Sequence, residues 1–335
     1  MSEPLQHYVP KFMLRRFSSG GRELVHAFDK HQDKIFAFST SKKSKVGVVA
    51  ERAIYDFEFQ GVPMTLEPAL SSLETKAAEV TARVIAAQEL PPAWNEEKAI
   101  LASFMAVQLV RTKATMATFD DLSSRIEGFL RAEGAPQEFF QPDPIVGSKE
   151  NARKAHYAKL ITNASRDWAP LLLKKVWHLI KTTEETPFFM GDHPVVRFND
   201  PNAEGRGKLG SASMGVQLYF PLSPTLALSL MCPTYLEMML DGIESIDRLL
   251  VSKTVGPSSL RAQRKEISSI VEALLEGDVT EVRPENVEHF NSLQVLEAER
   301  YVFSVKNDFS MVREMIQEDG SIRRGTRLVE GSGHF

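Results

Sequence analysis

Apolar residues recur along the chain with two different periods, and the change of period divides it into regions. Residues 23–28 and 34–39 alternate between apolar and polar side chains around a turn-like stretch, which predicts an N-terminal β-hairpin. From residue 66 the apolar positions follow a helical period, and helices are predicted over about 66–88, 95–132 and 149–163. The central part of the chain is therefore expected to be helical.

The C-terminal half is patterned in shorter stretches that indicate a sheet with helices beside it. Strands are predicted over 175–182, 187–198, 216–222, 225–231 and 300–305, and helices over 167–173, 235–250, 260–275 and 284–299. Together these elements predict an α+β fold with an N-terminal β-hairpin region, a central helical segment, and a C-terminal mixed or antiparallel sheet with flanking helices. The aromatic residues of 50–59 are expected to pack onto the sheet of the hairpin.

The predicted elements are assigned to a single domain that covers residues 1–335. Its subregions are 1–60 with the N-terminal hairpin, 66–170 with helices, 171–310 with sheet and helices, and a C-terminal tail over 311–335. The stretch 199–215 is rich in Gly, Asn and Ser, and is predicted to be a mobile loop.

The stretch from His7 to Phe17 carries large apolar side chains unusually close to the N-terminus. Because a terminal segment normally frays unless it is tied down, we expect it to insert into the body of the fold. Pro10 is suited to the first turn of a short helix, in which Phe12 and Arg16 would share one face. His7 would then enter the interior beside a guanidinium.

Composition narrows the class of protein. The formal net charge of −4 over 335 residues argues against broad electrostatic binding of nucleic acid, although a local basic groove stays compatible with it. The run from Lys42 to Lys45 is either a solvated connection or a loop that contacts phosphate. The lone Cys232 excludes a Cys-rich zinc site, and no apolar run approaches the roughly 20 residues that span a bilayer. With no signal-peptide pattern, a cytoplasmic protein without membrane contact is expected.

Several short motifs are spread along nearly the whole chain. They are His-Tyr-Val-Pro-x-Phe-x-Leu-Arg-x-Phe over 7–17, Glu67 and Glu74, Gln108-x-x-Arg111-Thr112, Gly191-Asp192-His193-Pro194, Phe220-Pro221-Leu222-Ser223-Pro224, Asn291, and Ala298-x-Arg300. This set resembles the bacterial family called domain of unknown function 4238. Members usually carry Ser or Thr before the Asp and Asn after it, where this chain has Gly191 and His193. The resemblance implies no activity.

Two pairs in the predicted helices are candidates for chemistry. Glu67 and Glu74 are two helical turns apart and share a face, so they could bind a divalent cation, divide acid and base roles, or simply face solvent. Gln108 and Arg111 lie on or beside an apolar stripe. A guanidinium there either pairs with a carboxylate, for which Glu74 is the candidate, or awaits a phosphate or carboxylate ligand.

Two further pairs lie in the C-terminal half. Asp192 interrupts an apolar strand, either as a turn residue or as a group that projects into a cleft beside His193. Asn291 and Arg300 flank the last predicted helix. Arg300 could bridge Glu297 or reach the same pocket as Arg111.

Three functional hypotheses follow. The sequence lacks a phosphate loop, a dinucleotide fingerprint, a zinc helix and a nucleophile elbow, so no nucleotide cofactor is expected. The first hypothesis is a phosphodiester-cleaving enzyme, a nuclease with RNA favoured over DNA. Such an enzyme would act as a toxin or in defence. It would need either no cofactor or a divalent metal, Mg²⁺ or Mn²⁺. The alternatives are a non-catalytic module that binds an anionic ligand or a protein partner, and a purely structural network of buried pairs. Whether the chain is an enzyme stays open, as does its oligomeric state.

The nuclease hypothesis assigns a role to each candidate. The catalytic candidates are His7, Glu74, Gln108, Arg111 and Asp192. The substrate-binding candidates are Tyr8, Arg15, Arg16, His193, Asn291 and Arg300. Glu67 is the candidate metal ligand, and the hypothesis requires these side chains to meet around one cavity.

Overall fold

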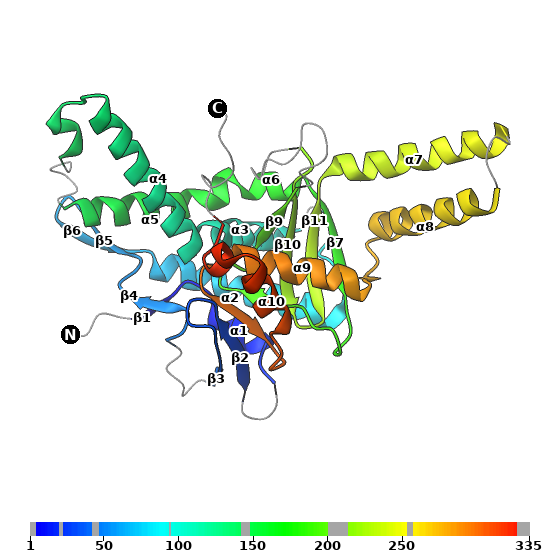
Figure 1. Cartoon of the computed structure of the whole chain (residues 1–335), viewed down its shortest axis with the longest axis horizontal. Coiled ribbons are helices and arrows are strands. Elements are labelled where there is room, and N and C mark those ends of the chain that lie inside the picture. The colour runs from blue at the N-terminus through cyan, green and yellow to red at the C-terminus, as the bar shows by residue number, and fades with distance from the viewer. Residues whose placement is uncertain are drawn as a thin grey trace.

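The N-terminal hairpin and a strand from the C-terminal part share one sheet in the computed structural model (Figure 1). The structure describes residues 5–19, 23–41, 47–93, 95–141, 148–199, 214–252 and 257–326. β2 (Leu24–Asp29) pairs antiparallel with β3 (Lys34–Ser39), as predicted, and its other edge pairs with β13 (Tyr301–Ser304). β8 (Met190–Gly191) completes the sheet beside β13. The N-terminal part therefore packs across the C-terminal half.

A second, five-stranded sheet is formed by the C-terminal half. Its order is β12 (Thr280–Glu281), β7 (Val176–Lys181), β11 (Leu226–Met231), β10 (Gln217–Ser223) and β9 (Val196–Phe198). All neighbours are antiparallel except β12 and β7, so the sheet is mixed and the predicted α+β class is confirmed. The predicted strand 187–198 is divided, because β8 and β9 lie in different sheets on either side of the turn at Asp192.

Residues 50–59 form strands outside the sheet of the hairpin, and Tyr55 belongs to the same buried cluster as Val25 and Ala27 of β2. β4 (Ala50–Arg52) pairs with β1 (Leu5–His7), and β5 (Asp56–Phe59) forms its own hairpin with β6 (Val62–Thr65). Ala53 lies between β4 and β5 with a φ of 49°, a left-handed conformation that ends the first strand. The chain thus changes direction between β4 and β5.

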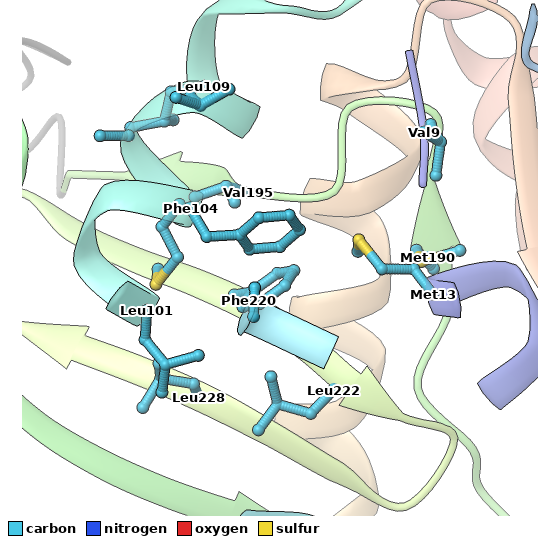
Figure 2. Close-up of a cluster of buried hydrophobic side chains, with 14 of the residues drawn as sticks. Val9, Met13, Leu101, Phe104, Leu109, Met190, Val195, Phe220, Leu222 and Leu228 are labelled. Atoms are coloured by element: carbon cyan, nitrogen blue, oxygen red, sulfur yellow. The ribbon is translucent and has the colours of Figure 1, made fainter. Parts of the chain in front are cut away.

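The helices of the central part enclose the apolar core. They are α2 (Glu67–Ala87), α3 (Glu96–Val110), α4 (Lys113–Ala132), the short 3-10 helix η1 (Gln137–Phe140), α5 (Lys149–Asp167) and α6 (Ala169–Leu173). α3 is the innermost, and its Phe104 packs on Phe220 of β10 with ring centroids 6.1 Å apart. Figure 2 shows these rings beside Val195 and Met190, with Met13 of α1 (Lys11–Arg16) close by. The N-terminal segment is thus part of the core.

The prediction of one long helix over 95–132 is wrong, because the helix is broken between α3 and α4. Thr112 is extended, with φ −91° and ψ 160°, and its side chain accepts a hydrogen bond from the backbone N–H of Thr115. Threonine is a good N-cap residue, so α4 starts anew at this position. The break places Arg111 and Thr112 at a joint, where their side chains contact distant parts of the chain.

The remaining helices lie after the second sheet. They are α7 (Pro233–Ser252), α8 (Pro257–Glu276), α9 (Pro284–Glu297) and α10 (Ser310–Glu318), followed by the 3-10 helix η2 (Gly320–Arg323). The segment predicted as a C-terminal tail therefore includes most of α10, whose Val312 and Ile316 are buried against Phe28 and Val302. The lysine run at 42–45 and most of the loop 199–215 lie outside the described residues. No helix in the described part is long and apolar enough to cross a membrane.

Candidate functional site

α1 anchors the opening motif in the fold. Pro10 precedes the helix, Leu14 and Phe17 are fully buried, and the Arg16 guanidinium lies 4.9 Å from the centroid of the Phe12 ring, so the predicted shared face is confirmed. Nη2 of Arg16 donates to the carbonyl of Ala78 at 2.9 Å, and burial lowers the pKa of Arg16 to about 10. These contacts fasten α1 to α2.

Arg15, the other substrate-binding candidate of α1, is exposed. Its Nε donates to the carbonyl of Thr40 at 3.4 Å, a long bond that links α1 to the end of the first hairpin. Neither Arg15 nor Arg16 lines the hollow between β4, α4 and α5 that is described below.

Arg111 joins four elements at the break between α3 and α4. Its Nη1 lies 2.7 Å from a carboxylate oxygen of Glu74, which confirms the pairing that the sequence offered as one alternative. Its Nη2 donates to the carbonyl of His7 at 2.6 Å, and its guanidinium lies 5.6 Å from the centroid of the Tyr55 ring. Burial and the nearby Glu74 carboxylate raise the pKa of Glu67, which is therefore close to the same group. His7, Glu67, Glu74 and Arg111 thus form one cluster.

Gln108 points into the interior one turn before Arg111. Its side chain is fully buried, and neither its amide nitrogen nor its amide oxygen has a hydrogen-bond partner among the described residues. Among the described residues, Gln108 therefore makes no side-chain hydrogen bond to the Arg111 cluster. Its side chain is also closed to solvent.

Asp192 organises the segment that follows α9. Its Oδ1 accepts from the backbone N–H of Glu299 at 2.7 Å, and its Oδ2 accepts from those of Arg300 and Tyr301 at 3.0 and 3.1 Å. Burial nonetheless outweighs these bonds and raises the pKa of Asp192 to about 6. Asp192 therefore fixes the entry to β13.

His193 is buried on the opposite side of the same turn. Its Nδ1 lies 2.6 Å from Oγ1 of Thr112, which ties the turn to the break between α3 and α4. Burial lowers the pKa of His193 to about 3, so the imidazole is neutral at pH 7. Its Nε2 has no hydrogen-bond partner within the described ranges.

Asn291 and Arg300 have different surroundings. The side chain of Asn291 accepts from the backbone N–H of Phe189 and donates to the carbonyl of Pro187, so it brackets the strand before Asp192. Arg300 pairs with Asp29 rather than with Glu297: its Nη2 lies 2.8 Å from Oδ2 of Asp29, and its Nε contacts both carboxylate oxygens.

A hollow rich in charged side chains lies between β4, α4, α5 and the segment 299–301. This hollow, called the cleft below, has a volume of about 530 Å³. Its floor includes Tyr8, Ile54 and Tyr157, and its charged wall includes His31, Glu51, Arg52, Lys113, Asp120, Glu150, Arg153, Lys154, Asp192, Glu299 and Arg300. Of the predicted site residues, Tyr8, Asp192 and Arg300 line it. The cluster of His7, Glu67, Glu74 and Arg111 does not, nor do Gln108, His193 and Asn291.

A family model described as a protein of unknown function (DUF4238) matches residues 5–308. The chain belongs to this family. No curated protein and no solved structure matches it.

Gly191 of this DUF4238 chain lies where β8 passes close to α9. A Cβ atom at position 191 would lie 2.8 Å from the carbonyl oxygen of Gln294 in α9 and 3.1 Å from the Cβ of Ala298. The backbone of β8 therefore approaches α9 too closely for a residue larger than Gly at position 191 unless one of the two elements moves.

Sequence reasoning missed most of the cleft in the DUF4238 chain. Lys113 directly follows the Gln-x-x-Arg-Thr motif, and Arg153, Lys154 and Tyr157 lie on neighbouring positions of α5. Their spacing of one turn along a single helix was the available signal. This spacing alone does not identify a site, because solvated charged faces are common on surface helices.

Most charged groups of the cleft are already paired. Lys113 lies 2.6 Å from Glu51, Arg153 lies 2.6 Å from Asp120, and Lys154 lies 3.7 Å from Glu150. The side chains of Lys113 and Arg153 are 31% and 50% exposed, so solvent and ligands reach them. Such exposed pairs stabilise a fold by only about 0–1 kcal/mol and exchange partners readily.

The residues predicted to hold a metal do not assemble in the DUF4238 fold. Glu67 lies near Glu74, whereas the oxygens of Asp192 face the backbone N–H groups of 299–301. Among the described residues, no group of three or more His, Cys, Asp or Glu side chains is placed to hold a metal ion. Glu67 and Asp192 therefore lie in different surroundings.

Proposed function

We propose that this protein binds a small anionic molecule in the cleft, as a cytoplasmic binding module. A volume of about 530 Å³ lies within the range of small-molecule sites, roughly 300–1,000 Å³. The floor of aromatic and aliphatic side chains suits the body of such a ligand. The wall supplies the charged groups that would orient it.

The observation that carries the proposal is a surplus of hydrogen-bond donors in the wall. Asp192 already accepts three backbone N–H bonds, so it has little capacity left for a ligand. Arg153 contacts Asp120 through Nη1, and Lys113 contacts Glu51, yet a guanidinium has five N–H donors and an ammonium three. A ligand rich in acceptors, such as a phosphate or carboxylate, best satisfies the remaining donors.

The test measures binding to the cleft directly. Calorimetric titration with inorganic pyrophosphate, citrate and uridine monophosphate should reveal saturable binding by at least one of them. The double variant Lys113→Gln/Arg153→Gln should weaken it at least tenfold without lowering the melting temperature, because both pairs are exposed. Arg248→Gln, which removes an exposed pair with Glu244 on α7, should leave binding unchanged. Absence of binding by all three probes would refute the proposal.

Phosphodiester cleavage, with RNA favoured over DNA, is the second candidate. It is supported by the same donors, which suit a phosphodiester, and by a carboxyl in the wall whose pKa of about 6 suits proton transfer near neutral pH. Of the five catalytic candidates Asp192 alone lines the cleft, so this candidate function requires it for proton transfer despite its three backbone donors, while His7, Glu74, Gln108 and Arg111 would act by positioning β1 and α3. Labelled RNA and DNA should be cleaved by the wild type, with or without Mg²⁺ or Mn²⁺, and not by Asp192→Asn. Equal residual cleavage by the wild type and by Asp192→Asn would refute this candidate function.

A further inference from the structure

Tyr8 and Tyr157 both belong to the floor of the cleft, but their hydroxyl groups have different surroundings. The two residues are 5% and 3% exposed. The hydroxyl of Tyr157 donates to the carbonyls of Val110 and Thr112, at 2.7 and 3.2 Å. The hydroxyl of Tyr8 makes no hydrogen bond to any residue that the structure describes. Because a desolvated hydroxyl without a partner is unfavourable, Tyr8 is the group of the floor that a ligand in the cleft would satisfy.

The main chain on both sides of Tyr8 is held in place. The backbone N–H of Tyr8 donates to the carbonyl of Val49 at 3.0 Å, and Val9 is fully buried. The preceding carbonyl, that of His7, accepts from Nη2 of Arg111 at 2.6 Å. A donor that is fixed before a ligand arrives loses little conformational freedom on binding. Tyr8 is therefore a pre-organised donor at the floor of the cleft.

The surroundings of the Tyr8 hydroxyl keep it protonated. Burial raises the pKa of Tyr8 above its usual value, and Asp192, Tyr301 and Glu51 raise it further, against the opposing effect of Arg300. The hydroxyl is therefore a hydrogen-bond donor at any pH near neutrality. Tyr301 also contributes its side chain to the cleft, but it is only partly buried, so solvent can satisfy its hydroxyl.

The charged groups around this hydroxyl favour a neutral acceptor over an anionic one. The Asp192 carboxylate acts on it most strongly, whereas Glu51 and Arg300 each have a counter-charge of their own. The buried ammonium of Lys30 also acts on Asp192, but it does not line the cleft. An anionic group placed beside Tyr8 would therefore meet the charge of Asp192, while a neutral carbonyl oxygen accepts the bond without this repulsion.

We propose that the ligand of the cleft carries a neutral carbonyl group apart from its anionic group, as a pyrimidine nucleotide does, and that Tyr8 donates a hydrogen bond to this carbonyl. Tyr8 thereby sets the specificity of the anion-binding function proposed above, on which this role depends. The anionic group meets the spare donors of Lys113 and Arg153 on α4 and α5, and the carbonyl meets Tyr8 at the floor. A ligand without the carbonyl leaves the Tyr8 hydroxyl unbonded, so the cleft discriminates against it.

Calorimetric titration with uridine monophosphate and ribose 5-phosphate tests this role of Tyr8. Both ligands are sugar phosphates, but only the nucleotide has base carbonyls. Tyr8→Phe, which removes the hydroxyl and keeps the ring, should weaken uridine monophosphate binding by about fivefold or more. It should leave ribose 5-phosphate binding as in the wild type. The melting temperature should not fall, because no hydrogen bond within the described part of the chain is lost.

Tyr219→Phe is the matched control. Tyr219 is also buried, does not line the cleft, and donates from its hydroxyl to Oε1 of Gln217 at 2.9 Å. The control should therefore lower the melting temperature and leave the affinity for uridine monophosphate unchanged.

The role of Tyr8 is overturned if Tyr8→Phe binds uridine monophosphate as tightly as the wild type, or if the variant weakens both ligands by the same factor. It is also overturned if uridine monophosphate does not bind while pyrophosphate or citrate does. In each of these cases the anion-binding function stands. Failure of all these anions to bind would instead refute the anion-binding function itself. Undetectable binding of ribose 5-phosphate, together with the loss for uridine monophosphate in Tyr8→Phe, would support the role of Tyr8.

Discussion

Nη1 of Arg111 lies 2.7 Å from the carboxylate of Glu74, and the two side chains are 2% and 26% exposed respectively. The same guanidinium donates to the carbonyl of His7, and the hydroxyl of Tyr55 donates to the carbonyl of Arg111. β1, α2, α3 and the turn before β5 are therefore held together by one buried cation. Its chief physical role is to order the segment from which Tyr8 enters the cleft.

Replacing Arg111 by Ala should lower the free energy of unfolding strongly. Removing one partner of a buried ion pair costs about 3–5 kcal/mol, because the remaining charge and the His7 carbonyl lose their partner. Urea denaturation should show this loss, while Arg248→Ala, in an exposed pair, should change stability by about 0.5 kcal/mol or less. An Arg111→Ala protein of unchanged stability would contradict this structural role.

Asp192→Asn should make the protein more sensitive to acid. Because the pKa of Asp192 is raised from 3.8 to about 6, the folded state binds more protons than the unfolded state between these pH values. Lowering the pH through this window thus stabilises the wild type, by on the order of 2–3 kcal/mol. The Asn amide that replaces the carboxyl cannot titrate, so the variant should lose more stability than the wild type between pH 7 and pH 4. Urea midpoints at each pH measure the difference, and parallel curves would disprove it.

His193→Asn should have the opposite effect. Burial lowers the pKa of His193 from 6.5 to about 3, so the unfolded state binds more protons and acid favours unfolding. The Asn side chain does not titrate, so it removes this proton linkage. The variant should therefore lose less stability than the wild type between pH 6.5 and pH 4. An imidazole that titrates near its ordinary pKa in NMR would show that this reasoning is wrong.

Local patterns predicted the elements well, and the long-range contacts poorly. The hairpin of β2 and β3 follows from alternation alone, and the shared face of Phe12 and Arg16 follows from helical spacing. Apolar periodicity continues through Arg111 and Thr112, so it could not show that α3 ends there. What ends it is tertiary: the bond between Thr112 and His193, and the ion pair of Arg111.

In the candidate site, too, local features were predicted and long-range partners were not. Asp192 was correctly singled out as a buried polar group at a strand end, but its three backbone donors come from residues more than 100 positions away. The pairing of Arg300 with Asp29 likewise joins opposite ends of the chain. Sequence spacing within one helix cannot identify such partners, which is why Glu297 was offered instead.

Gly191→Ser should destabilise the fold. The added Cβ would lie 2.8 Å from the Gln294 carbonyl, so β8 or α9 must move apart. Overpacking of this kind costs about 1–3 kcal/mol. Gly242→Ser, where a Cβ meets nothing within 4 Å, is the matched control and should show only a small change. Equal urea midpoints for the two variants would refute the close approach.

Gln108→Met should leave stability unchanged or raise it. The Gln108 amide is fully buried in α3, and neither of its polar atoms has a partner among the described residues. Burying an unbonded amide costs about 1–3 kcal/mol, whereas Met has a similar length and no such penalty. Thr81→Val is the comparison, since the Thr81 hydroxyl is buried but donates to the Ala77 carbonyl at 2.6 Å. Denaturant titration should rank Gln108→Met as the more stable of the two. A loss of more than about 1 kcal/mol in Gln108→Met would mean that the amide makes hydrogen bonds in the folded protein, and Gln108 would then again be a catalytic candidate.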